Sequence, residues 1–236
     1  GIMIQDIMVK TSGEQKLIYK AINGETSFKA EPNLLKGAEY VKQLMGSGFF
    51  QNFFTATDYG AARNMFGQEK AAMYYMGSWE MGMTSDENFS KSFRDNLSVT
   101  YFPAIQSGKG RATDIMAWNG GGYAVAAESK KRLEALEVLK YMYRPDNWAK
   151  NAWQMGVCIP AQKYEEFLTG DETLVQKKLT NMLSNATSIS GTPWFDSTVP
   201  SFKTEGENLS QELAASIKTP QQFIEAIDKA AERITE

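Results

Sequence analysis

Helical and strand-length apolar patterns alternate along this chain of 236 residues. Residues 33–45 repeat their apolar side chains at helical spacing, and a second helix is expected from an Asp58 cap to Gly67. Short apolar runs at 71–76 and 97–102 have the length of buried strands. Short strands separated by helices, with connections too long for hairpins, predict an α/β architecture with a mixed or parallel sheet.

The second half of the chain is predicted to be mainly helical. Residues 129–145 place apolar and charged side chains at helical spacing, which predicts a helix that Pro145 ends. The side chains expected to face inward are Leu133, Leu136, Leu139 and Tyr143. A following helix should carry Trp148 and Trp153, which are interpreted as core or interface residues. Residues 219–222 form a capping box with proline at the first helical position, so a last helix is expected.

The composition excludes several classes of function. The chain has no histidine and a single cysteine, Cys158, so Ser-His and Cys-His nucleophile pairs and nearly every zinc site are excluded. Cys158 is interpreted as a small apolar core residue without a function. No cofactor, catalytic residue or metal ligand is predicted. The net charge of −3, with no basic block, argues against nucleic acid as a partner, and no apolar run is long enough to cross a bilayer.

Several short motifs follow one another along the chain. They are FGQEKAAMYYMGSW at 66–79, YFP at 101–103, WNGGGYAV at 118–125, the helical pattern at 129–142, GVCIP at 156–160 and TP at 219–220. In this order the motifs closely resemble the latter part of family 1 extracellular solute-binding proteins, the maltose-binding-protein-like components of ABC sugar importers. The resemblance covers nearly the whole chain.

The resemblance implies a two-lobed α/β fold of the periplasmic-binding-protein-like II class. Residues 1–119 and 162–236 would belong to the C-terminal lobe, and residues 120–161 would be a crossing segment that packs with the N-terminal lobe. The first part of the N-terminal lobe would lie before Gly1. A chain without that part is expected to bind sugar weakly or undetectably by itself. The family also implies a periplasmic or cell-surface location, with a lipid anchor in some members.

Trp79 is the first candidate ligand residue. A sugar presents faces of C–H groups and a rim of hydroxyls, so its site needs flat aromatic rings and hydrogen-bonding groups. Trp79 follows the predicted strand at 71–76, at the end where open α/β sheets bind ligands, and the matching Trp of the family stacks on sugar. The neighbouring Glu80 is interpreted either as an acceptor for sugar hydroxyls or as an acid at a solvated helix start.

The segment that begins at Trp118 is the second candidate. Asn119 carries both a donor and an acceptor, and Gly120 and Gly121 expose backbone amides, so this segment is interpreted as a ligand contact, a hinge or both. Trp118 itself is interpreted as core packing or as a ligand contact.

Residues 191–196 are the third candidate, because they combine a turn, two aromatic rings and a carboxylate. Trp194 is predicted to be a second platform and Asp196 a hydroxyl acceptor, with an aromatic plug under a loop as the alternative. The resemblance thus implies a binding protein that captures a sugar or oligosaccharide and delivers it to ABC permease subunits. The other hypothesis is a carbohydrate-active enzyme that uses Glu80 and Asp196 as its carboxylates.

Overall fold

The structure, a computed structural model, describes residues 1–118 and 120–235 and divides into two compact units. Unit 1 comprises Gly1–Thr57, Tyr101–Trp118 and Asn185–Glu236, and unit 2 comprises Asp58–Thr100 and Asn119–Ser184. In this division residues 58–100 and 162–184 group with the segment that was predicted to be the crossing segment, and the lobe boundaries implied by the resemblance stay a prediction. The chain is a helix-rich α/β protein.

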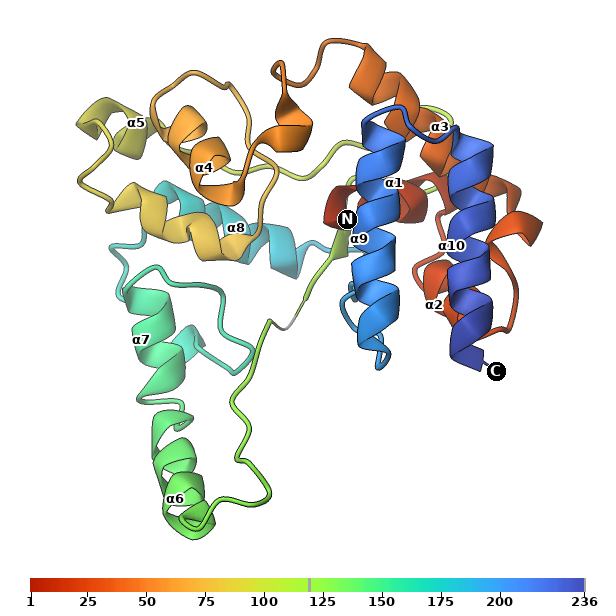
Figure 1. Cartoon of the computed structure of the whole chain (residues 1–236). Coiled ribbons are helices and arrows are strands. Elements are labelled where there is room, and N and C mark those ends of the chain that lie inside the picture. Colours follow the sequence, from red (N-terminus) through yellow and green to blue (C-terminus); the bar gives the residue numbers. More distant parts are fainter. Residues whose placement is uncertain (119, 236) are drawn as a thin grey trace. The chain divides into compact units, whose positions relative to one another are not determined.

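Unit 1 consists mostly of helices around one apolar core, as Figure 1 shows for α9 and α10 lying side by side. Its elements are α1 (Ile2–Ser12), α2 (Leu17–Ile22), η1 (Phe28–Ala30), α3 (Pro32–Gly46), η2 (Phe54–Ala56), β1 (Asp114–Met116), β2 (Ser188–Ser190), α9 (Pro200–Ala214) and α10 (Pro220–Thr235). Helix α1 packs mainly against α3, and α10 packs against α9 and α3. The core includes Ile7, Met8, Ile18, Leu34, Trp194 and Phe223.

Two helix starts follow the sequence signals closely. The Thr219 hydroxyl accepts from the Gln222 amide at 3.2 Å, and the Gln222 side chain accepts from the Thr219 amide at 2.9 Å. The predicted capping box of α10 is therefore confirmed. Asp58 likewise caps α4 (Tyr59–Gly67) by accepting from the Ala61 amide at 2.7 Å.

The sheet of unit 1 has two parallel strands within the described chain, with Ile115 paired to Ile189. The loop before β1 is tied to α1 by Lys10, a buried residue whose ammonium donates to the carbonyl of Asp114 at 2.6 Å and also reaches those of Arg111 and Ala112. Gly110 makes this approach possible, because a Cβ there would stand 2.7 Å from the Lys10 Cα.

Unit 2 is built from short helices around two smaller apolar clusters. Besides α4 its elements are η3 (Ser78–Thr84), α5 (Lys91–Asn96), α6 (Arg132–Met142), α7 (Trp148–Gln154), η4 (Glu165–Phe167) and α8 (Leu174–Ser184). One cluster centres on Trp153, Tyr164 and Met81, and the other on Phe89 and Phe93. Trp153 is thus a core residue, as interpreted from the sequence, whereas Trp148 is half-buried against Tyr143.

The strands predicted at 71–76 and 97–102 are wrong, because neither run has strand geometry in the structure. A strand needs a neighbour to satisfy its backbone groups, and no described segment pairs with either run. Both runs have an irregular backbone, and their side chains pack on neighbouring residues instead. Tyr74, for example, lies against Phe66 with the ring centroids 5.6 Å apart.

The inward face predicted for the helix at 129–145 is also wrong. No residue of α6 is buried, and Leu133 is 76% exposed. Periodic apolar spacing shows that a helix face can be buried, but a packing partner is needed to bury it. Unit 2 does not supply that partner among its described residues.

No helix among the described residues is long and apolar enough to span a membrane. Nor do any three described Cys, Asp or Glu residues gather where they could hold a metal ion.

Candidate functional site

Trp79 lies at the start of η3 in unit 2, with 38% of its surface exposed. Its ring folds back over Gly77, since a Cβ at that glycine would overlap the indole. The hydroxyl of Tyr59, in the first turn of α4, forms a hydrogen bond with the Trp79 side chain. One ring face is therefore held while part of the indole stays open to solvent. The predicted strand is absent, but Trp79 remains at an exposed chain turn.

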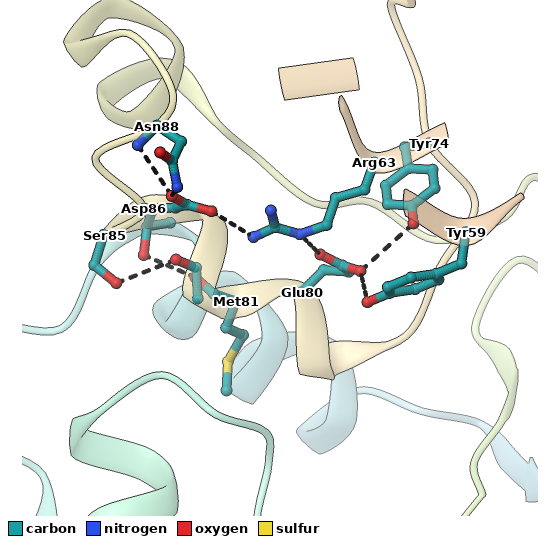
Figure 2. Close-up of polar contacts among 10 residues, drawn as sticks. Tyr59, Arg63, Tyr74, Glu80, Met81, Ser85, Asp86 and Asn88 are labelled. Atoms are coloured by element: carbon teal, nitrogen blue, oxygen red, sulfur yellow. Dashed lines mark hydrogen bonds and ion pairs between the residues drawn. The ribbon is translucent and has the colours of Figure 1, made fainter. Parts of the chain in front are cut away.

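Glu80 stands at the centre of a polar network that joins α4 to η3 (Figure 2). Its Oε2 accepts from the Arg63 Nε at 3.1 Å, and its Oε1 accepts from the hydroxyls of Tyr59 and Tyr74. The Arg63 Nη2 pairs with Asp86 at 2.9 Å. Both carboxylate oxygens of Glu80 are thus bonded from within the chain.

The network perturbs its own titratable groups. Burial and then the Glu80 carboxylate raise the pKa of Tyr59, and Tyr74 is shifted in the same direction by the same two causes. The Asn88 amide and then the Arg63 guanidinium hold the pKa of Asp86 below its usual range. At neutral pH the network therefore contains two protonated phenols and an ionised Asp86 carboxylate.

Unit 1 carries a second exposed aromatic group, at the carboxyl ends of its two parallel strands. Trp118 follows β1 by two residues and Phe195 follows β2 by five. Their ring centroids are 5.6 Å apart at 48°, and the Lys203 ammonium lies 4.7 Å from the centre of the Phe195 ring. Trp118 is 40% exposed. Carboxyl ends of parallel strands are where open α/β sheets bind ligands, so this pair occupies a favoured position.

Asp196 lies on the surface beside this pair and anchors the turn after β2. Its Oδ2 accepts from the Thr192 amide at 2.8 Å and from the hydroxyl of Tyr19. Burial and then the Asp196 carboxylate raise the pKa of Tyr19. Gly191 is required here, because a Cβ would collide with the Tyr19 hydroxyl.

Trp194 is a core residue of unit 1, so its predicted role as a ligand platform is wrong. The side chain has an exposed fraction of 0%, and it packs on Gly206 and lies 6.3 Å from Phe223 between ring centroids. Its backbone amide donates to the Gln5 side chain at 3.0 Å. The alternative of an aromatic plug under a loop describes this position.

The remaining predicted residues follow Trp118. Asn119 lies outside the described residues. Gly120 has a φ of 72°, and a Cβ at Gly120 or Gly121 would meet open space. Both glycines are exposed. The Cys158 thiol, interpreted as a core residue without a function, is half-buried, and burial raises its pKa.

Tyr59, Arg63 and Tyr19 belong to these two regions and were not found from the sequence. Tyr59 and Arg63 are four residues apart and therefore share one face of α4, which was the only local signal. Tyr19 reaches Asp196 across 177 positions of sequence, and no local pattern could show that contact.

Comparison with known proteins gives one matching family and similar solved structures. The pattern of the family described as bacterial extracellular solute-binding protein matches residues 11–147. No curated protein matched the sequence. Among solved structures, a chitin oligosaccharide binding protein superposes with a TM-score of 0.84 at 23% identity, over 99% of this chain and 56% of the other.

A second solved structure comes from work on xylan utilization by the thermophilic bacterium Caldanaerobius polysaccharolyticus. It superposes with a TM-score of 0.83 at 22% identity, over 97% of this chain and 57% of the other. The chain therefore spans little more than half the length of either protein. At this level of identity the superpositions establish the fold.

Proposed function

Because this chain belongs to the bacterial extracellular solute-binding protein family, we propose that it forms part of the sugar-binding surface of an ABC importer's binding component. The observation that carries the proposal is the pair of half-open indoles, Trp79 in unit 2 and Trp118 in unit 1. Each is held on one side by its own unit, and each leaves part of a flat apolar ring available. Such rings suit the C–H faces of a pyranose.

Polar groups near each ring would read the sugar hydroxyls. In unit 1, Asp196 accepts bonds from Tyr19 and Thr192 and remains on the surface, where its oxygens can also accept a hydroxyl. The backbone amides of Gly120 and Gly121 carry no side chain that would block a ligand. Asn119 is proposed as a donor and acceptor from its side-chain chemistry alone. Glu80 is proposed mainly to hold Trp79, since its oxygens are already bonded.

The uncovered face of α6 supports the proposal that residues 120–161 pack against further protein in the complete binding component. Leu133 and Leu136 are exposed there, which is unfavourable for a helix that has no partner. The solved structures are longer than this chain, which leaves room for such a partner. From the family, we also propose that the complete binding component docks on permease subunits outside the cytoplasm, with or without a lipid anchor.

The enzyme hypothesis has less support. Its two carboxylates belong to different units, Glu80 to unit 2 and Asp196 to unit 1. A glycosidase needs a general acid with a raised pKa beside a second carboxylate. Glu80 is instead paired with Arg63, and both of its oxygens are already bonded within the chain.

The proposal is tested by isothermal titration calorimetry of the chain with an oligosaccharide panel that includes xylo-oligosaccharides and chito-oligosaccharides. We expect weak binding, with a dissociation constant of about 1 mM or more, because open surfaces provide few simultaneous contacts. Trp79→Ala and Trp118→Ala should each abolish the heat signal. Trp148→Ala is the control, because Trp148 is a half-buried Trp that packs on Tyr143 and belongs to neither the Trp79 nor the Trp118 contacts. Equal binding by Trp79→Ala and the unaltered chain would remove the central site assignment.

A further inference from the structure

Arg63 connects two carboxylates, one within the segment that carries Trp79 and one just after that segment. Glu80 lies in the first turn of η3, and Asp86 lies two residues past its end. Arg63 binds them with different nitrogens, Nε to Glu80 at 3.1 Å and Nη2 to Asp86 at 2.9 Å (Figure 2). A single guanidinium from α4 thereby fixes both ends of η3. A lysine would hold the two carboxylates in a less defined geometry, because its ammonium rotates freely and lacks the rigid planar fork of a guanidinium.

The guanidinium is itself held in place. Arg63 is only a quarter exposed, and its Cζ lies 5.0 Å from the centre of the Phe89 ring. Asp86 is oriented independently, since its Oδ1 accepts from the Asn88 amide at 3.0 Å and from the Asn88 side chain at 2.9 Å. A charge pair with fixed partners on every side loses little entropy when it forms, so it can define a geometry.

Trp79 is constrained from the same side of the network. Tyr59, one turn before Arg63 on the same face of α4, contacts both Glu80 and Trp79. Gly77 lies against the indole ring. The remaining freedom of the ring is therefore the placement of η3 against α4, and this is what the Arg63 bridge sets.

We propose that Arg63 is the positioning residue of the Trp79 platform, acting through Glu80 and Asp86 without touching the ligand. The inference rests on the proposed function for the role of Trp79. It assigns sugar affinity to a residue whose side chain points into a protein network. Loss of the bridge should let η3 and its indole sample several positions, and a platform that is not preorganised binds more weakly.

The test is fluorine NMR of the whole chain labelled with 5-fluorotryptophan. The chain has five Trp residues, so the label provides five probes. The Trp79 signal is assigned by its loss in Trp79→Phe. In Arg63→Met we expect this signal to shift and broaden, while the signals of the buried Trp153 and Trp194 stay in place. Arg63→Lys should give an intermediate effect, because the ammonium keeps the charge but lacks the planar fork that fixes the two carboxylates in one geometry.

Controls separate positioning from general stability. Arg144→Met removes an exposed pair with Asp146 in the same unit and should leave the Trp79 signal unchanged. Glu80→Gln keeps the size of the side chain and should move the signal as Arg63→Met does, which covers the case where Arg63→Met fails to fold. The sugar dissociation constant should rise about tenfold in Arg63→Met.

The ligand-free spectra decide the inference without any sugar. An unchanged Trp79 signal in folded Arg63→Met, or in Glu80→Gln, would overturn it. Failure of the unaltered chain to bind any sugar would instead contradict the proposed function, and would leave the positioning result standing on the spectra.

Discussion

Unit 1 and unit 2 differ in how completely they bury their own apolar side chains. Unit 1 joins its helices around one continuous core and has Trp194 and Lys10 sealed inside. Unit 2 divides its apolar residues between two small clusters and leaves α6 uncovered. The difference teaches that stability and ligand recognition draw on different residues here. The buried indoles support the fold, and the half-open indoles are the proposed sugar contacts.

The largest expected effect separates these two kinds of indole. Trp194→Ala should lower the free energy of unfolding by about 3–5 kcal/mol, because it leaves a cavity in a closed core. Trp118→Ala, at 40% exposure, should cost about 1 kcal/mol or less. Urea unfolding followed by circular dichroism measures both. Similar costs for the two variants would break the distinction between core and platform.

Lys10 gives the next largest effect, since unit 1 relies on it to close α1 onto the loop before β1. Lys10→Met removes a buried ammonium and leaves three carbonyls and Asp6 without it, so we expect a loss of about 3 kcal/mol. Lys20→Met, which removes a half-exposed pair with Glu14, should cost less than about 1 kcal/mol. A midpoint for Lys10→Met equal to that of Lys20→Met would show that the tie is dispensable.

Acid should weaken unit 1 through Asp114. Burial alone would raise the pKa of Asp114, but bonds from the Arg111 amide and Ser188 and the charge of Lys10 together lower it. A lowered folded pKa stabilises the protein above the ordinary aspartate value of about 3.9, and this contribution is lost as pH falls through the folded pKa. Denaturant midpoints at pH 7, 4 and 3 should therefore fall less steeply in Asp114→Asn than in the unaltered chain. Parallel curves would contradict this assignment.

The smallest effect is expected on the open face of α6. Leu133→Ser should change the free energy of unfolding by less than about 0.5 kcal/mol, because the side chain is already exposed. Leu34→Ser in the unit 1 core is the matched comparison and should be strongly destabilising. A large cost for Leu133→Ser would mean that this face is covered in solution.

Sequence patterns found the features that are local in the chain. The caps at Asp58 and Thr219 were predictable because donor and acceptor lie within three residues of each other. The strands at 71–76 and 97–102 were not, because an apolar run does not reveal whether a partner strand exists. Trp194 and Trp118 show the same limit for the site. Trp194 packs on Gly206, and Trp118 packs on Phe195. Neither contact is between sequence neighbours, so no local pattern reveals how far each indole is buried.

Trp79 and Trp118 are proposed ligand contacts, each within its own unit, whereas Trp153 and Trp194 are core residues. Titration of the 5-fluorotryptophan-labelled chain with millimolar oligosaccharide tests this in one sample, since the buried indoles serve as internal controls. We predict that the signals of Trp79 and Trp118 shift in a saturable manner and that those of Trp153 and Trp194 remain fixed. Unmoved signals for both exposed indoles across the oligosaccharide panel would contradict the account.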